Sequence, residues 1–473
     1  MNKSVLQVVT DLFLTNLEIP KAIYMKKKFI YIIALFFFGI TSGFIILKYK
    51  NDKDRKESQV YEIISRKGNS IQTTEWTLAK KISGGLIQKI KENPSDIKSL
   101  NGLTAIYLQE ARASGNYSYY DKAALNCVNA VLRKDPKNFE ALTFKATIYL
   151  SQHHFAEGLN VATQAQKMYP YSAFVYGILI DANVELGNYK TAVEDAEKMI
   201  SIRPDIRSYS RISYLREIHG DIPGAIDAMK MAVDAGSAGT ESTEWARVQL
   251  GKLYEQLGEL KYAEMHYTIA LDNRPNYSYA LAGLARMAIA AKDYQKAIDL
   301  FRHADSSSND YSFREALVEV YKLADNQRQS SSIANAIIDE MEAAASAMAK
   351  GDSSGHYADR EMAYAYLAVG NYNKAREHAL LEYNRRPNNI DANETLAWVY
   401  YQKGDYAKAQ SYIKTALQTN CKNPGLLCHA GLIYARSADN AGAKKYLQEA
   451  LKNNPNISPL LKTEAEQVLK SLM

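Results

Sequence analysis

Small, apolar and aromatic residues recur along this chain in a fixed order that predicts pairs of antiparallel helices. The clearest copy runs Gly251, Tyr254, Gly258, Ala263, Ala270 and Pro275. The small residues let the two helices of a hairpin approach closely, and the glycine between them ends the first helix in the left-handed conformation that a tight turn needs. The proline stops the second helix. Each copy therefore predicts one helical hairpin.

The copies repeat at a constant interval. Pro136, Pro170 and Pro204 lie 34 residues apart, and the turn glycines Gly370 and Gly404 repeat that spacing. The same offsets recur in Gly431, Tyr434, Ala438, Ala443, Ala450 and Pro455. A period of this length indicates stacked hairpins that bury their apolar faces on one another, so we expect one elongated body and function along a surface.

This order of small residue, Tyr, Gly, Ala, Ala and Pro resembles the tetratricopeptide repeat over roughly residues 97–457. Residues 208–236 and 429–461 resemble an uncharacterised group of bacterial membrane or envelope proteins with this repeat. The resemblance implies an all-α fold, a right-handed superhelical solenoid of about ten hairpins, and a binding role rather than an enzyme. One transmembrane helix is expected to precede the solenoid.

The expected membrane segment is Phe29–Leu47, which contains no charged residue and approaches the length of about 20 residues needed to cross a bilayer as a helix. Lysines flank both ends, where they can reach lipid headgroups. A cleaved signal peptide is the alternative, but no A-x-A-like site follows the apolar run. We expect a single-pass membrane protein with its repeats on the periplasmic or extracytoplasmic side. After cleavage, the alternative is a soluble secreted protein that self-associates.

These observations predict a domain order. We expect an N-terminal extension at 1–24, with a mis-assigned start before Met25 as one explanation, an anchor or signal-anchor at 25–50 and a juxtamembrane linker at 51–72. A capping helix at 73–96 precedes the first part of the array at 97–305. A degenerate repeat with an insertion at 306–356 separates it from the last part at 357–457, and a capping helix at 458–473 closes the chain.

Charge and candidate chemistry narrow the function further. The net charge of +6 lies mostly within residues 1–60, which hold ten basic and five acidic side chains, so the near-neutral array argues against nucleic acid as a partner. No H-E-x-x-H, G-x-S-x-G or phosphate-binding loop motif occurs. His153 and His154 are neighbours that point in different directions, so we expect no metal and no cofactor there. We expect no catalytic residues.

The remaining candidate surface is the concave face, which the resemblance assigns to the first helix of each hairpin. Aromatic residues and both signs of charge interleave on it, as suits an extended peptide or a partner helix. The predicted groove residues are Phe174, Asp181, Arg207, Tyr214, Glu217, Trp245, Lys252, Tyr279, Arg286, Tyr357, Arg360, Tyr364, Glu394, Trp398 and Tyr401. We expect about half of the tyrosines to pack between repeats.

We expect protein or peptide partners, during envelope assembly or secretion, and no small-molecule substrate. The alternative from another class is a ligand-binding or regulatory subunit of an envelope enzyme. That alternative requires a closed pocket built from the insertions near residues 236–242 and 306–356.

Overall fold

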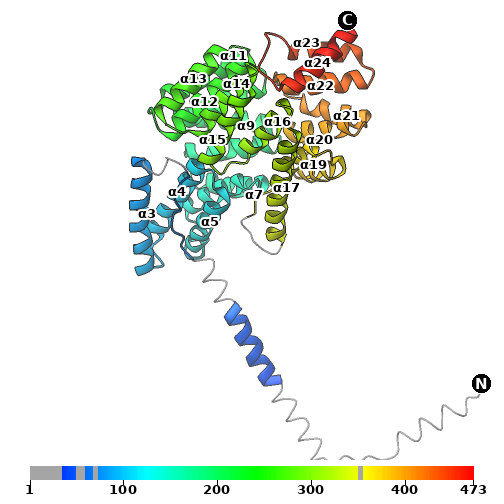
Figure 1. Ribbon diagram of the computed structural model, residues 1–473. Helices are drawn as coiled ribbons and strands as arrows, with labels where there is room; N and C mark the ends of the chain where they lie inside the picture. The colour runs from blue at the N-terminus through cyan, green and yellow to red at the C-terminus, as the bar shows by residue number, and fades with distance from the viewer. Residues whose placement is uncertain (1–34, 50–58, 68–72, 350–354) are drawn as a thin grey trace, which may run out of the picture. The chain divides into compact units, whose positions relative to one another are not determined.

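The computed structural model describes residues 35–49, 59–67, 73–349 and 355–473 (Figure 1). Within these ranges the chain is helical and contains no strand. It divides into two units, Met1–Gln59 and Val60–Met473. The expected extension at 1–24 and most of the expected linker at 51–72 lie outside the described residues.

The described part of the first unit is a helix over residues 35–49. Its large apolar side chains are exposed, among them Phe36, Phe38 and Ile45. Among the residues that the structure describes, none of the helices combines the length and the apolar character that crossing a membrane requires. The first residues of the expected span, 29–34, fall outside the described part of the chain.

The described residues of the second unit form a row of ten helical hairpins between two terminal helices, as the period predicts. The N-terminal helix is α3 (Thr74–Glu92) and the C-terminal helix is α24 (Pro459–Leu472). The first five hairpins are α4 (Ile97–Ser114) with α5 (Tyr117–Lys134), α6 (Phe139–Ser151) with α7 (Phe155–Met168), α8 (Ala173–Glu185) with α9 (Tyr189–Ile202), α10 (Ile206–Ile218) with α11 (Ile222–Asp234), and α12 (Glu241–Gln256) with α13 (Leu260–Asn273). The others are α14 (Ser278–Ala290) with α15 (Tyr294–Ser307), α16 (Ser312–Leu323) with α17 (Gln327–Ala349), α18 (Asp359–Ala368) with α19 (Tyr372–Arg385), α20 (Ile390–Gln402) with α21 (Tyr406–Ala416), and α22 (Pro424–Arg436) with α23 (Asn440–Ala450).

The recurring small residues act as the sequence predicts. Ala263 and Ala270 on α13 are completely buried. A Cβ atom on Gly251 of α12 would lie 2.5 Å from a ring carbon of Tyr267, so the close approach of α12 and α13 requires glycine there. The degenerate repeat expected at 306–356 is the hairpin of α16 with α17, whose second helix extends over 23 residues.

Residues 60–67 pack against the first hairpin, in the stretch expected to be linker. The Tyr107 hydroxyl bonds to the backbone of Tyr61, and the Tyr120 hydroxyl accepts from the Ile64 N–H at 3.2 Å. Arg66 is buried and donates to both carboxylate oxygens of Glu110, at 2.7 and 2.9 Å. This segment and α3 therefore cover the otherwise open end of the solenoid.

The first helix of each hairpin forms the inner layer of the solenoid. Successive first helices contact one another, as α6 does with α8, α12 with α14 and α18 with α20, in addition to their hairpin partners. Helices on the inside of a curved stack lie closer together than those on the outside. The inner face is therefore the surface that the first helices present, in agreement with the resemblance.

The solenoid turns back onto itself after six hairpins, a feature that the repeat alone does not predict. The Tyr357 N–H donates to the Gln152 carbonyl at 3.1 Å, and the Asn456 N–H donates to the Glu255 carbonyl at 3.0 Å. The Asn309 N–H donates to the Ser114 carbonyl at 2.9 Å. These partners are about 200 residues apart, close to six periods of 34 residues.

The contacts follow one rule. The turn inside each of the first five hairpins contacts a connecting segment six repeats later in the chain. For the first four turns this segment leads into the first helix of a hairpin, and for the fifth it leads into α24. The segments contacted are, in order, 308–310, 355–357, 388–390, 420–422 and 453–456. We call α4 to α15 the N-terminal layer and α16 to α24 the C-terminal layer. Backbone hydrogen bonds, and the close packing of these turns against the connecting segments, hold the two layers together.

Candidate binding surface on the inner face

About half of the predicted groove residues are occupied in packing. The Tyr279 hydroxyl donates to Asp310 at 2.8 Å, and the Tyr401 hydroxyl donates to Glu464 at 2.8 Å. Trp398 stacks on His429, with ring centroids 3.9 Å apart, and His429 in turn bonds to Glu394 at 2.8 Å. These side chains join neighbouring helices, so their polar or aromatic groups already have partners within the fold.

Three further predicted groove residues also have structural partners. Trp245 is half-buried against the core between α11 and α12. Arg286 donates to the Glu255 carboxylate at 2.9 to 3.1 Å and to the Tyr267 hydroxyl at 3.0 Å. Tyr357 lies at the junction of the two layers, stacked on His154 with Arg385 above its ring.

The other predicted groove residues of the N-terminal layer keep part of their surface free. Phe174 on α8 is 38% exposed and Tyr214 on α10 is 39% exposed. The Arg207 guanidinium lies 5.6 Å from the centre of the Phe174 ring, a cation–π contact. Asp181 binds Arg211 through both carboxylate oxygens, at 2.6 and 2.8 Å. Aromatic and charged side chains thus alternate across α8 and α10.

Burial shifts the pKa values of charged groups on this surface. Desolvation raises the pKa of Glu185 to about 7, although Arg386 opposes the shift. Desolvation also raises the pKa of Glu217, which accepts a hydrogen bond from Gln256. It lowers the pKa of Lys252 to about 8. The inner face therefore holds polar groups that water solvates poorly, and such groups gain most from a partner that bonds to them.

A cavity of about 410 Å³ opens among α16, α17 and α18, in the region of the degenerate repeat. Three polar atoms there are buried without a hydrogen-bond partner in the described part of the chain: Oε1 of Glu315, Nε of Arg360 and Oε2 of Glu361. Burial raises the pKa of Glu315 to about 7. Tyr364, another predicted groove residue, also lines this cavity, and burial raises its pKa to about 12.

Comparison with known proteins agrees with this architecture. Two family models, both described as tetratricopeptide repeat, match residues 248–311, 360–423 and 424–457. This chain contains tetratricopeptide repeats. Over 105 residues, 22% of the chain, it is 31% identical to the small glutamine-rich tetratricopeptide repeat-containing protein 2 of Saccharomyces cerevisiae, and the match spans 30% of that relative's length.

Solved structures with the repeat are also similar. A tetratricopeptide repeat protein from Parabacteroides merdae aligns with 18% identity and a TM-score of 0.33, over 57% of this chain and 98% of that one. The human IFIT1 dimer with PPP-AAAA aligns with 16% identity and a TM-score of 0.45, over 73% of this chain and 78% of that one. The tetratricopeptide repeats form a scaffold suited to protein–protein interaction.

Sequence reasoning did not select Glu315, Glu361 and His356, because none of them lies at an inner-face offset of a regular tetratricopeptide repeat. Glu315 lies in the degenerate repeat, where the offsets fail, and His356 lies in the connection that follows it. The interruption of the period indicated this region, and the inner-face offsets selected Arg360 and Tyr364, which also line the cavity. Neither signal identified Glu315 or Glu361.

Proposed function

We propose that this chain is a scaffold that binds an extended segment of a protein partner along the inner face of its N-terminal layer. The observation that carries the proposal is the pair of half-exposed aromatic rings, Phe174 and Tyr214, on successive first helices with Arg207 beside them. Aromatic and arginine side chains contribute most of the energy at protein interfaces. Asp181 on α8 and Lys252 on α12 add both signs of charge to the predicted groove, which favours a partner segment of mixed charge.

The test uses a photo-cross-linking amino acid at position 174 or 214 in cells that express the full chain. The matched control places the same amino acid at Tyr262, which is 52% exposed on α13, a second helix outside the inner layer. We expect a discrete cross-linked protein from both inner-face positions and none from position 262, and we expect Arg207→Ala to weaken both cross-links. Equal cross-linking from all three positions contradicts the proposal.

Trp245 and Trp398 are poor probes of binding, although both are predicted groove residues. Each packs against a hydrophobic core, so replacement by alanine would reduce stability as well as any binding. Phe174 and Tyr214 avoid this ambiguity because more than a third of each residue remains exposed.

We also propose that the segment 29–47 anchors the scaffold in a membrane, with the repeats on the extracytoplasmic side, where envelope assembly or secretion would supply its partners. The uncharged sequence and the exposed apolar side chains of residues 35–47 support this. Alkaline extraction of membranes followed by N-terminal sequencing tests it. Retention of the chain with residues 29–47 intact agrees with an anchor, whereas release with a new N-terminus beyond residue 43 indicates a secreted protein.

A second candidate is binding of a polar small molecule in the cavity among α16, α17 and α18. The unpartnered atoms of Glu315, Arg360 and Glu361 favour this role, which corresponds to the ligand-binding alternative. A thermal-shift screen of small polar compounds tests this role. A compound that raises the Tm of the unchanged protein but not that of Arg360→Met would support it. An unchanged response in that variant would remove it.

A further inference from the structure

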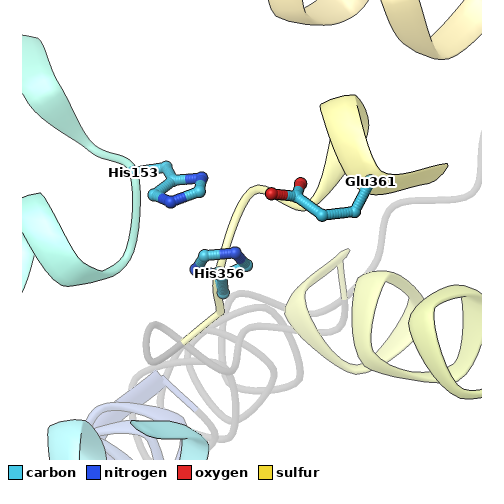
Figure 2. A group of neighbouring side chains, drawn as sticks. All are labelled: His153, His356 and Glu361. Atoms are coloured by element: carbon cyan, nitrogen blue, oxygen red, sulfur yellow. The ribbon is translucent and has the colours of Figure 1, made fainter. Parts of the chain in front are cut away.

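Three side chains, one from the N-terminal layer and two from the C-terminal layer, converge where the two layers meet (Figure 2). His153 belongs to the turn between α6 and α7, His356 to the segment before α18, and Glu361 to the first turns of α18. One nitrogen of each imidazole and one carboxylate oxygen lie within 4.8 Å of one another. In Figure 2 both rings and the carboxylate point toward the same space.

Backbone carbonyls orient both imidazoles. The Nδ1 atom of His153 lies 3.0 Å from the Tyr357 carbonyl oxygen, and the Nδ1 atom of His356 lies 3.1 Å from the Ser151 carbonyl oxygen. A carbonyl only accepts hydrogen bonds, so each Nδ1 carries the proton and donates it. Each Nε2 is then left with a lone pair, as in metal sites where a backbone carbonyl fixes the tautomer of a histidine ligand.

The carboxylate lacks the partner that its burial requires. Oε2 of Glu361 is buried and accepts no hydrogen bond from any residue that the structure describes. Buried polar atoms without partners are rare and costly, and an absent ion is one of their ordinary explanations. This oxygen is a separate observation from the carbonyl bonds that orient the two histidines, and a bound cation would satisfy it.

We propose that His153, His356 and Glu361 bind one divalent transition-metal ion, with zinc as the best match. Two imidazoles and one carboxylate are a recurrent ligand set for zinc, with a fourth position left for water or another ligand. Donor atoms about 2.0–2.1 Å from a tetrahedral ion lie roughly 3.3 Å apart, so the three groups must close by at most about 1.5 Å. The exposed side chain of His356 can make that movement.

The site would join the two layers. His153 and His356 are held by reciprocal bonds across the same junction, next to the backbone bond from Tyr357 to Gln152. Histidine stands here at the turn position that glycine occupies in the other four turns of this contact series. Glu361 also lines the cavity of 410 Å³, so the fourth ligand position would lie close to that space. The cluster does not include His154, whose Nε2 bonds to the Gly355 carbonyl at 3.1 Å.

The test is a titration of the full-length, tag-free chain in detergent with Co²⁺, read by visible absorption, followed by displacement with Zn²⁺. We expect one ion per chain and the absorption bands of a tetrahedral site. We expect His356→Gln and Glu361→Gln to weaken Co²⁺ affinity at least tenfold, while His303→Gln, a change at an exposed histidine outside the cluster, leaves affinity unchanged. His153 is the harder position to change because its backbone has a φ of 61°.

A second measurement separates loss of the site from loss of the fold. Circular dichroism of His356→Gln and Glu361→Gln without metal should match that of the unchanged protein, and only the unchanged protein and His303→Gln should gain thermal stability on addition of Zn²⁺. The proposal is overturned by the absence of saturable one-to-one binding. It is also overturned if binding persists with equal affinity in both cluster variants, which would place the ion elsewhere.

Discussion

At the scale of single residues, the turn glycines divide into two groups that the sequence does not distinguish. Gly187 and Gly370 both have positive φ, 79° and 75°. A Cβ atom on Gly187 would lie 2.4 Å from the backbone of Asn388 in the other layer, whereas a Cβ atom on Gly370 would meet nothing within 4 Å. Glycine is therefore needed at position 187 both for its positive φ and for the close contact with the other layer. At position 370 it is needed only for its positive φ.

This difference gives a matched pair of substitutions. Gly370→Ala should reduce the free energy of unfolding by about 1 kcal/mol, because alanine is strained at positive φ. Gly187→Ala should cost about 1–3 kcal/mol more, because its methyl group also displaces the Asn388 backbone. Urea unfolding of both variants measures the difference, and equal losses would contradict the layer contact.

Asp121 is a residue whose burial makes stability depend on pH. It is 2% exposed, its Oδ1 has no hydrogen-bond partner among the described residues, and desolvation raises its pKa from 3.8 to about 7. Because the pKa is higher in the folded state, protonation favours folding. The stabilisation is complete below about pH 4 and is lost as pH rises to about 7.

Asp121→Asn should remove this dependence. Between pH 4 and pH 8 the unchanged protein should lose roughly 1–4 kcal/mol of stability relative to the variant, since each unit of pKa shift corresponds to about 1.4 kcal/mol. Urea unfolding at the two pH values measures the change. Parallel pH profiles for the two proteins would show that Asp121 ionises normally.

At the scale of elements, an irregular segment stabilises the end of a regular array. Residues 60–67 supply Arg66, whose side chain is buried between Glu110 of α4 and Glu75 of α3. Glu75 also pairs with Arg274 at 2.7 Å, and the hydrogen bonds to these arginines lower its pKa to about 2 against the opposing effect of burial. Three elements therefore depend on one buried network.

Arg66→Ala should destabilise this end of the solenoid by about 3–5 kcal/mol, because it leaves Glu110 buried without its partner. Ser65→Ala is the control, since Ser65 is exposed in the same segment. Hydrogen exchange localises the effect. Amide protection in α3 and α4 should fall in Arg66→Ala and not in the control, and unchanged protection in both would mean that the segment does not cap the array.

At the scale of the whole molecule, the sequence predicts the contacts within one hairpin. It does not predict the contacts between hairpins that lie six repeats apart. The small residues Gly251, Ala263 and Ala270 act within one hairpin, so their spacing predicts the helices, and the resemblance to the tetratricopeptide repeat adds which helices face inward. Contacts six repeats apart leave no periodic signal. The partners of His153, including His356 and Tyr357, therefore became visible only in the folded chain.

The same limit explains the candidate site. Offsets within the repeat placed Phe174 and Tyr214 on the inner face, but offsets cannot tell an exposed ring from one that packs, as Tyr401 does against Glu464. The interruption at 306–356 predicted a degenerate repeat with an insertion. It could not specify the cavity, because the identity of its polar residues follows from the packing of α16, α17 and α18 within the C-terminal layer.

The stacking of the two layers is the central claim of this account, and cross-linking of the Ser114 and Asn309 positions tests it most directly. These residues lie 195 positions apart but share a backbone hydrogen bond of 2.9 Å, which brings their Cα atoms within the range of a disulfide or a short bis-maleimide. The background replaces the three buried native cysteines, Cys127, Cys421 and Cys428, with serine. Ser114→Cys with Asn309→Cys should cross-link rapidly within one chain under native conditions and not in urea. Failure of the native protein to cross-link, in a variant that remains helical, would contradict the stacked arrangement.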